Sequence, residues 1–351
     1  MFEISAWPAF RCRNRYNRLL YEALRRHGVY TSEFQPLRVL LNGPDLLHLH
    51  WPDDLLNRRS WLLAFALVMG LVLYLLLIRL RGVRIVWTVH NLRSHEHYHP
   101  KLERCFWRIF PRLIDGYICL SRSARRIALK RWPPLRRKPG GVARHGHYVP
   151  LYLNSPTRKE SRKLLGIPAT SAMFLFFGQV RAYKNIEALI RAFRGFDNER
   201  AALVISGRAA SLPFGERIKA LARPDDRIRV DLRFLDEHVL RTHIAAADLV
   251  VLPYGRPYNS GAALMALSCS RPVLVPDYPT MRSLRRDVGA DWVHTYRGVL
   301  DQAALRQSLD AADAASRGGR PDLSLYDWEE VAEATIALYR RVLPASKASM
   351  Q

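Results

Sequence analysis

The stretch Met173–Phe193, MFLFFGQVRAYKNIEALIRAF, constrains the fold most because it reads as a strand, a glycine, a short polar loop and a helix. Five apolar residues end at Gly178, and apolar residues then recur at helical spacing from Ile186. Such a unit sets a phosphate against the first free amides of a helix. Gly178 lets the backbone approach that ligand, while Arg181 and Lys184 place cations beside it. The alternative is an ordinary buried strand and amphipathic helix whose two cations are solvated.

The rest of the chain repeats this alternation of strands and helices. Buried strands are expected in the first half at Phe2–Ala6, Tyr30–Phe34, Asp45–His50, Arg84–Val89 and Gly116–Leu120, and in the second half at Ala201–Ser206, Ile228–Asp231, Ala247–Pro253 and Pro272–Pro276. Alternation at this spacing predicts an α/β fold with parallel, doubly wound sheets. The 351 residues suffice for two domains, which we expect at 1–150 and 151–351. A terminal amphipathic helix, Leu325–Leu343, is expected to belong to the second domain or to pack back across both.

A second candidate anion site lies in Tyr254–Ala263, YGRPYNSGAA, which follows a strand and enters a helix. Ser260 and Gly261 would present backbone amides at the start of that helix. Two anion sites in one Rossmann-like domain suit a diphosphate better than an isolated phosphate. The alternative is a simple helix cap with no ligand.

The charge of the chain favours an anionic partner. Lysine and arginine number 55 against 31 aspartate and glutamate residues, a formal charge of +24. Nucleic acid, an acidic membrane surface and a phosphorylated substrate all fit such an excess. The arginines form no stripe interleaved with aromatic residues and no recognised nucleic-acid module, so no nucleic-acid partner is expected. The four cysteines lack zinc-site spacing and suit a reducing compartment.

Trp61–Ile78 is 18 residues long without a charge, and arginines flank it on both sides. Its length qualifies it as a membrane span. A span would, however, separate Asp45–His50 from Arg84–Val89, which should be neighbours in one sheet. We therefore favour a helix partly embedded in one leaflet, with a wholly buried core helix and a true span as alternatives.

Polar side chains follow two of the expected strands of the first domain. Asp53 and Asp54 follow Asp45–His50, and His90 opens the segment His90–Leu102, which carries four histidines. Ligands bind at the carboxyl ends of strands in open α/β sheets. The histidine segment offers no cysteine or acidic ligand at a recognisable metal spacing, so no metal is expected.

The ordered set FGQVRAYKNIEALIRAF, LVISGRA, ADLVVLPY and SGAALMALSCSRPVLVP resembles the donor half of GT-B glycosyltransferases of the family 4 type. The resemblance covers most of Leu151–Leu343 and implies a GT-B fold of two Rossmann-like domains facing a cleft. It implies that Arg181 and Lys184 hold the diphosphate of a nucleotide sugar above Gly178. It also implies that Ser260 and Gly261 provide the second anion site.

One feature departs from family 4, whose two glutamates fall at Pro257 and Met265 in this chain. This departure puts the standard retaining mechanism in doubt. The SGAALMALS variant, the HLHWPDD and WTVHN segments and the apolar helix resemble bacterial exopolysaccharide transferases such as the family 94 β-mannosyltransferases of xanthan-type assembly. That resemblance implies inverting, metal-independent transfer of mannose from GDP-mannose to a lipid-diphosphate-linked oligosaccharide, by a peripheral enzyme on the anionic cytoplasmic face of the inner membrane.

An inverting transfer needs one base for the acceptor hydroxyl and cations for the departing nucleoside diphosphate. The base candidates are Asp53, Asp54, His90 and Glu96, each of which also has an ordinary packing, capping or solvated role open to it. His145 is a further candidate for a diphosphate contact, because its turn should border the cleft.

Three other functions remain open on the sequence. A retaining family 4-type transferase would use another nucleotide sugar. A nucleic-acid-binding protein would explain the charge, and an inactive GT-B scaffold would explain the missing glutamates. Salt-dependent binding of DNA or RNA would identify the second of these, and binding without turnover of any nucleotide sugar would identify the third.

Overall fold

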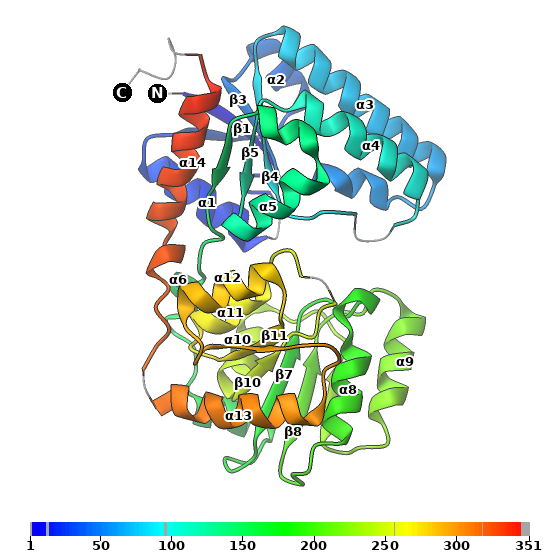
Figure 1. Ribbon diagram of the computed structural model, residues 1–351, viewed down its shortest axis with the longest axis vertical. Coiled ribbons are helices and arrows are strands. Elements are labelled where there is room, and N and C mark those ends of the chain that lie inside the picture. The colour runs from blue at the N-terminus through cyan, green and yellow to red at the C-terminus, as the bar shows by residue number, and fades with distance from the viewer. Residues whose placement is uncertain (1, 12–13, 95–96, 256, 318, 345–351) are drawn as a thin grey trace. The chain divides into compact units, whose positions relative to one another are not determined.

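The structure is a computed structural model that describes residues 2–11, 14–94, 97–255, 257–317 and 319–344 (Figure 1). The chain divides into two compact units, Met1–Gly146 together with Leu325–Gln351, and His147–Ser324. Each unit holds one sheet of six parallel strands. The predicted α/β class with two parallel sheets is confirmed.

The first unit is built on a sheet with strand order β2-β1-β3-β4-β5-β6. Its strands are β1 (Glu3–Trp7), β2 (Tyr30–Glu33), β3 (Leu46–Leu49), β4 (Arg84–Val89), β5 (Gly116–Cys119) and β6 (Gly140–Val142). Its helices are α1 (Arg15–Arg26), α2 (Pro36–Asn42), η1 (Pro52–Asn57), α3 (Trp61–Leu80), α4 (Pro100–Leu113), α5 (Arg122–Arg131), η2 (Pro133–Arg137) and α14 (Trp328–Val342). The β3 and β4 strands are buried along almost their whole length, which fits their mainly apolar sequences, and the polar side chains of His48 and Thr88 are buried with them.

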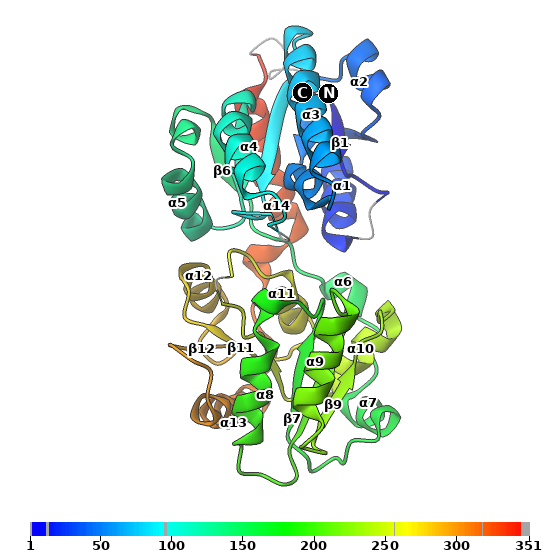
Figure 2. The ribbon, with the colours of Figure 1, turned by 90° about the vertical axis from the view of Figure 1, so that its right-hand side faces the viewer.

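The second unit is built on a sheet with strand order β12-β11-β10-β7-β8-β9. Its strands are β7 (Met173–Phe177), β8 (Ala202–Ser206), β9 (Ile228–Asp231), β10 (Leu249–Val251), β11 (Val273–Pro276) and β12 (Val293–Tyr296). Its helices are α6 (Val149–Tyr152), α7 (Arg158–Leu165), η3 (Ala182–Lys184), α8 (Ile186–Arg194), α9 (Leu212–Ala222), α10 (Glu237–Ala246), α11 (Gly261–Ser268), α12 (Pro279–Val288) and α13 (Gln302–Arg317), and η4 (Ser324–Tyr326) leads into α14. The helices α8 and α9 lie side by side against this sheet (Figure 2).

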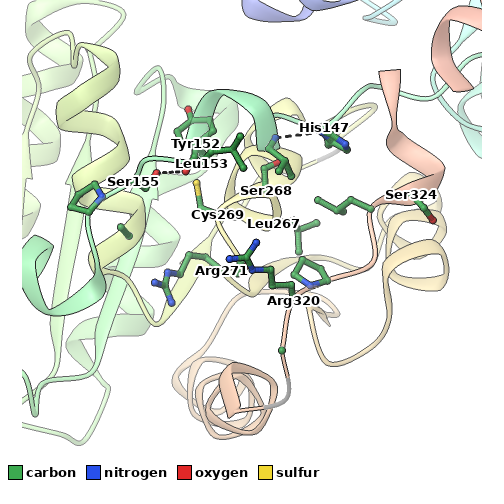
Figure 3. Close-up of a pocket in the computed structure, with 17 residues that line it drawn as sticks. His147, Tyr152, Leu153, Ser155, Leu267, Ser268, Cys269, Arg271, Arg320 and Ser324 are labelled. Carbon is green, nitrogen blue, oxygen red and sulfur yellow. Dashed lines mark hydrogen bonds between the residues drawn. The ribbon is translucent and has the colours of Figure 1, made fainter. Parts of the chain in front are cut away.

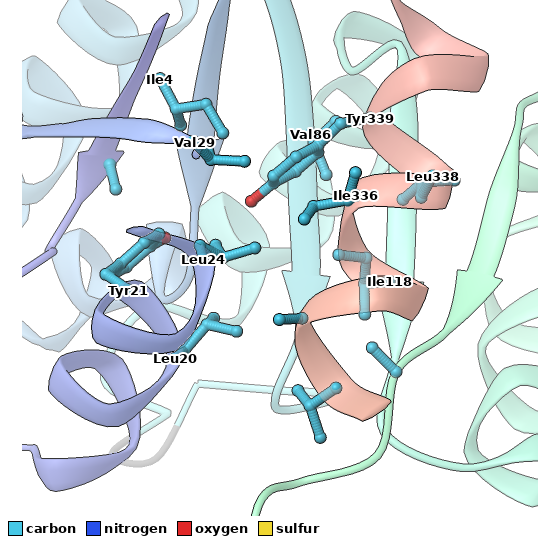
Figure 4. Close-up of a cluster of buried hydrophobic side chains, with 14 of the residues drawn as sticks. Ile4, Leu20, Tyr21, Leu24, Val29, Val86, Ile118, Ile336, Leu338 and Tyr339 are labelled. Carbon is cyan, nitrogen blue, oxygen red and sulfur yellow. The ribbon is translucent and has the colours of Figure 1, made fainter. Parts of the chain in front are cut away.

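The terminal helix α14 corrects the predicted domain assignment, which gave 151–351 to the second domain. The structure places α14 in the first unit, where it packs against α1, β5 and β6. Its buried face includes Trp328, Ile336 and Tyr339, which join the apolar core of that unit (Figure 4). A Cβ on Gly116 would lie 2.5 Å from Val342 Cγ2, so a glycine in β5 allows the helix to approach the sheet closely. The core of the first unit is thus completed by the last helix of the chain.

The helix α3 is apolar on both its packed face and its exposed face. The packed face is Ala64, Val68, Leu71, Leu75 and Ile78, at alternating spacings of four and three residues. The exposed face includes Leu62, Leu73 and Leu80, which are 72%, 58% and 86% exposed. By length and composition α3 could cross a membrane, and 28% of its most apolar window is buried. The alternative of a wholly buried core helix is therefore wrong.

Candidate functional site

Two histidines meet at the carboxyl ends of β3 and β4. His50 follows β3 and His90 follows β4, and the two strands pair in parallel register. His50 Nδ1 lies 2.9 Å from His90 Nε2, and the His90 ring stacks on Trp51 with centroids 4.3 Å apart. His90 therefore lies at the carboxyl end of a strand, as predicted, and ligands of open α/β sheets bind at such strand ends.

A buried hydrogen-bond chain continues inward from His50. His50 Nε2 lies 2.6 Å from the Tyr21 hydroxyl, which is also 3.0 Å from His48 Nδ1. His48 Nδ1 lies 2.7 Å from the Tyr339 hydroxyl of α14, and His48 Nε2 lies 2.7 Å from Thr88 Oγ1. Each of these groups both donates and accepts, so the tautomer of His90 depends on the direction in which the chain is polarised.

Burial keeps these histidines neutral. It lowers the pKa of His48 to about 3 and lowers the pKa of His50 and His90 well below the usual value of 6.5. Neighbouring histidines lower the last two further, since each disfavours charge on the others. A neutral imidazole has one ring nitrogen that can accept a proton, so His90 retains the chemistry of a base.

Asp53 lies in η1 and is 2% exposed. Burial, and then the neighbouring Asp54, raise its pKa to about 7, although a hydrogen bond from the Asn91 side chain opposes the rise. Among the residues that the structure describes, none forms a hydrogen bond with Asp53 Oδ2. A carboxyl group with a pKa near 7 and an unsatisfied oxygen suits proton transfer at neutral pH.

The remaining first-domain candidates have different surroundings. Asp54 is exposed, and its Oδ1 accepts a hydrogen bond of 3.3 Å from Asn57. Glu96 lies outside the described residues. His145 is in the first unit, where its ring lies 4.6 Å from that of Tyr16 and its Nδ1 donates to the carbonyl of Gly146. Burial lowers the pKa of His145 to about 4, so its side chain is neutral.

Sequence reasoning missed most of the partners of His90 and Asp53. The pair His48 and His50 stands two residues apart in DLLHLH, which puts both on one face of β3. That spacing was a usable signal, whereas the hydroxyls of Tyr21 and Tyr339 reach the pair only through the fold. Glu103 was also missed: it is buried on α4 and accepts from the Ser94 amide at 2.9 Å. Glu103 thereby anchors the loop after His90.

In the second unit, the predicted glycine loop has the expected geometry. Gly178 follows β7 with φ of +112°, a conformation that favours glycine, and a Cβ placed on it would meet no atom within 4 Å. The backbone on that side is therefore open. A Cβ on Gly207, at the end of β8, would lie 2.0 Å from the Gly178 carbonyl oxygen. Gly207 is therefore a glycine because its backbone touches that of Gly178, whereas Gly178 is favoured by its positive φ.

Arg181 and Lys184 follow on the loop and on η3. Lys184 Nζ lies 3.6 Å from the centre of the Tyr254 ring and 5.3 Å from that of Tyr183. Burial, and then the charge of Arg181, lower the pKa of Lys184 to about 7. Two cations held together in this way gain from a bound anion, which relieves their repulsion. This arrangement favours the phosphate-binding interpretation over solvated cations.

Ser260 and Gly261 lie at the start of α11. The Ser260 hydroxyl accepts from the Ala263 amide at 3.1 Å and caps the helix, which Gly261 opens. The first amides of such a helix have no partner within it. The positions of the two family 4 glutamates hold Pro257, whose carbonyl accepts from Thr280, and Met265 on α11. Neither position can supply a carboxylate.

A pocket of about 820 Å³ lies at the carboxyl ends of β8 and β9, on the sheet edge that also carries the glycine loop. Its lining includes Arg208, Ser211 and Asp231. Val180 bridges to Ala209 of this pocket, so the loop and the pocket share backbone contacts. Ligands of parallel sheets bind along this edge.

Another pocket of the second unit, about 570 Å³, lies at the opposite end of α11 (Figure 3). Arg271, Arg320 and Cys269 line it. It is separated from Ser260 by the length of α11, about 12 Å at the standard rise. Burial raises the pKa of the Cys269 thiol to about 12, so this cysteine is protonated and a poor nucleophile.

Within the described ranges, no three His, Cys, Asp or Glu side chains are grouped to hold a metal ion. The histidine chain itself is joined by hydrogen bonds between rings and hydroxyls.

Comparison with known proteins places these features among sugar-transferring enzymes. A family profile described as "Glycosyl transferases group 1" matches residues 171–300, which include the glycine loop and α11. The chain is 34% identical over 330 residues to the GDP-mannose:glycolipid 4-beta-D-mannosyltransferase of Xanthomonas campestris pv. campestris, covering 94% of this chain and 89% of that protein. It is 28% identical over 225 residues to a D-inositol 3-phosphate glycosyltransferase of Kineococcus radiotolerans, covering 54% of this chain and 48% of that protein.

Solved structures share the fold at low sequence identity. The sucrose-phosphate synthase of Thermosynechococcus elongatus aligns with a TM-score of 0.69 and 16% identity, covering 97% of this chain and 99% of that one. The Anabaena protein HepE, solved with UDP and glucose, aligns with a TM-score of 0.66 and 14% identity over all of both chains.

Proposed function

Because the chain belongs to the group 1 glycosyltransferases and has their GT-B fold, we propose that it transfers mannose from GDP-mannose to a lipid-linked sugar acceptor with inversion. The similarity to the Xanthomonas GDP-mannose:glycolipid enzyme along nearly the whole chain supports this choice of donor and acceptor class. The absence of carboxylates at Pro257 and Met265 supports an inverting mechanism over the family 4 retaining one. The acceptor in this proposal is a lipid-diphosphate-linked oligosaccharide of bacterial exopolysaccharide synthesis.

The second unit binds the donor in this proposal. The diphosphate lies over the open backbone of Gly178, between the Arg181 and Lys184 charges and the first amides of α11. The pocket beyond β8 and β9 takes the nucleoside. As the glycosidic bond breaks, the leaving diphosphate gains negative charge, which the two cations stabilise without a metal. The reaction as proposed therefore uses no metal or other cofactor.

The first unit supplies the base, and we assign that role to Asp53. A carboxyl group with a pKa near 7 is ionised in a sizeable fraction of molecules at neutral pH and is still basic enough to accept a proton. His90 is proposed to position the acceptor with its ring, which Trp51 and His50 hold in place. This division of roles makes Asp53 the single most informative residue to replace.

The proposed location is the cytoplasmic face of the inner membrane. The exposed apolar face of α3 supports partial insertion into one leaflet, and the net charge of +24 supports attraction to anionic lipids. The acceptor, being attached to a lipid, would be met at the same surface.

The test is a transfer assay with GDP-[¹⁴C]mannose and a bacterial membrane lipid extract, beside the same assay with UDP-glucose, UDP-glucuronate and GDP-glucose. We expect label to enter the lipid fraction from GDP-mannose, and the anomeric configuration of the product to be β by NMR. Transfer from another nucleotide sugar only would contradict the donor. Binding of nucleotide sugars without turnover of any would contradict the enzymatic function in favour of a scaffold.

A further inference from the structure

A basic groove outside the candidate site lies between α4 and the segment formed by the end of α5 and η2. Arg104, Arg108 and Arg112 stand at four-residue spacing, so they share one face of α4. Arg131 and Arg137 stand on the opposite wall. The space between the walls is about 920 Å³. We call this feature the α4 groove.

The floor of the α4 groove is aromatic. Trp107 and Trp132 line it, with ring centroids 4.8 Å apart, and they are 4% and 2% exposed. In the described part of the chain, the Nε1 atom of each indole is buried and has no hydrogen-bond acceptor. An unpaired buried donor is costly, so both indoles gain from a ligand that accepts hydrogen bonds.

The groove is electrostatically one-sided. As far as the structure describes the chain, its lining contains five arginines and Lys138 and no carboxylate. Lys138 Nζ donates to the Arg112 carbonyl at 2.9 Å, which ties the two walls together. An anion with several acceptor oxygens is the ligand that such a lining recognises.

The neighbouring helix indicates where that anion comes from. The helix α4 packs against α3 (Figures 1 and 2). The other face of α3 is exposed and apolar. A nucleic acid bound at the groove would leave the α3 face in water, whereas a bilayer covers apolar face and basic groove together. We propose that the α4 groove binds the phosphate of an anionic phospholipid headgroup. The unpaired indole N–H groups of Trp107 and Trp132 are proposed as further donors to that phosphate.

This inference rests on the membrane association proposed above, but it is separate from the transfer reaction. The test uses full-length protein and two kinds of vesicle, phosphatidylcholine alone and phosphatidylcholine mixed with phosphatidylglycerol. The variant is Arg108→Gln with Arg131→Gln. Its control is Arg122→Gln with Lys130→Gln, which removes the same charge from exposed positions of α5 outside the groove.

We expect the groove variant to bind mixed vesicles about 30-fold more weakly, since each basic residue at an anionic surface contributes roughly a fivefold factor. Binding to phosphatidylcholine alone should be unchanged, and the control pair should lose less. Transfer to a detergent-solubilised acceptor should also be unchanged, which keeps a failure of the groove distinct from a failure of the proposed function. Equal losses on both vesicles, or in both variants, would overturn the site.

A second variant tests whether the indole N–H groups contribute to binding in addition to the positive charge of the groove. Trp107→Phe with Trp132→Phe keeps the aromatic floor and removes both indole N–H groups, so binding to mixed vesicles should weaken roughly tenfold. The matched control is Trp87→Phe, whose indole nitrogen is also buried and unpaired but which does not line the groove. Two results would overturn the lipid headgroup as the ligand, if the groove variants still bind vesicles. One is stabilisation of the free protein by inorganic phosphate, and the other is loss of single-stranded DNA binding in the groove variants.

Discussion

Lys184 Nζ lies 3.6 Å from the centre of the Tyr254 ring, so the ammonium group sits against the face of an aromatic side chain that follows β10. This contact fixes a cation beside the glycine loop without using a carboxylate. A carboxylate partner would neutralise the charge that a diphosphate needs, whereas an aromatic face supports the ammonium and leaves it available. Lys184, held against Tyr254, is therefore suited to bind an anion.

Replacement of Lys184 by alanine should lower kcat/KM by about 10²–10³, because a preorganised cation is worth most where charge develops in the transition state. The double variant with Arg181→Ala should be less than additive, since both cations serve one leaving group. Turnover of GDP-mannose and a thermal melt would be measured for each variant. Lys163→Ala on exposed α7 is the control. Wild-type turnover in Lys184→Ala would exclude this loop as the diphosphate site.

Donor binding should depend on pH through Lys184. Its pKa of about 7 means that the free protein loses the Lys184 charge as pH rises above 7, so binding of GDP must then take up a proton. The affinity for GDP should fall as pH rises from 7 to 9. Lys184→Met should bind weakly with a flat pH profile, and titration calorimetry in buffers of different ionisation enthalpy would count the proton. No proton uptake at pH 8 would contradict the lowered pKa.

Asp53→Asn should lower the rate of mannose transfer by a factor of about 10²–10⁴. The same substitution should stabilise the fold at alkaline pH. The folded-state pKa of about 7 lies above the unfolded value of 3.8, so the stabilisation of the fold by the protonated carboxyl group is lost by pH 7. Between pH 4 and 7 the carboxyl group is ionised in the unfolded state but still protonated in the fold. The free energy of unfolding of the wild type therefore falls by up to about 4 kcal/mol over this range, since a pKa difference of one corresponds to about 1.4 kcal/mol. The melting temperature of Asp53→Asn should therefore exceed that of the wild type increasingly as pH rises from 4 to 7.

The control for this experiment is Asp54→Asn at the neighbouring exposed position. It should retain most activity and lower the pKa of Asp53, because one of the charges that raise it is removed. An inactive Asp54→Asn beside an active Asp53→Asn would reverse the assignment of the base.

Acid should unfold the first unit through its neutral histidines. His48, His50, His90 and His145 have lowered pKa values in the fold and would bind protons freely once unfolded, so stability is lost as pH falls below about 6.5. Four such groups give a slope of about 5 kcal/mol per pH unit, and Asp53 opposes it with about 1.4, which leaves roughly 4. Urea unfolding at pH 7.0, 6.0 and 5.0 measures this slope. A flat profile would mean that the histidines are already solvated.

Membrane binding through α3 should survive high salt in part. Screening in about 1 M salt shortens the Debye length to roughly 3 Å and removes the attraction to anionic lipids, but apolar burial persists. Leu73→Glu should lower the membrane-bound fraction at least about tenfold, as a charge in the apolar layer costs a few kcal/mol. Leu164→Glu, at an exposed position of α7, is the control. Full release of the wild type by salt alone would contradict an embedded helix.

Sequence analysis predicted the bounds of β4, β7 and β9 correctly. Turn residues precede Arg84–Val89 and Ile228–Asp231, and Met173–Phe177 is an uninterrupted apolar run that ends at Gly178. The strand β6 was missed because Gly140 and Gly141 follow a proline and read as a break. Its conformation is fixed by pairing with β5, where Gly140 lies opposite Tyr117. A Cβ on Gly140 would collide with that ring, so the glycine is there to fit the partner strand.

The candidate site also contains parts that could be predicted from the sequence and parts that depend on the fold. The strand, glycine, loop and helix around Gly178, Arg181 and Lys184 could be predicted because these parts are adjacent in sequence, and their binding of a diphosphate stays a prediction. The environment of Asp53 was not predictable, since its raised pKa comes first from burial in the fold and is partly offset by Asn91, which arrives from the end of another strand. The link from His48 to Tyr339 spans 291 residues and exists only because α14 returns to the first unit.

That return of α14 sets an order of events during synthesis. Residues 147–324 form a continuous unit, so the ribosome releases everything needed to fold the second unit before the first unit has its last helix. Until residues 328–342 emerge, the core that Ile336 and Tyr339 will close stays open to solvent, and His48 lacks one of its hydroxyl partners. The second unit therefore matures as an insert within an unfinished one. Chaperone demand should be concentrated in this interval, and truncation before α14 should leave a donor-binding unit attached to an aggregation-prone first unit.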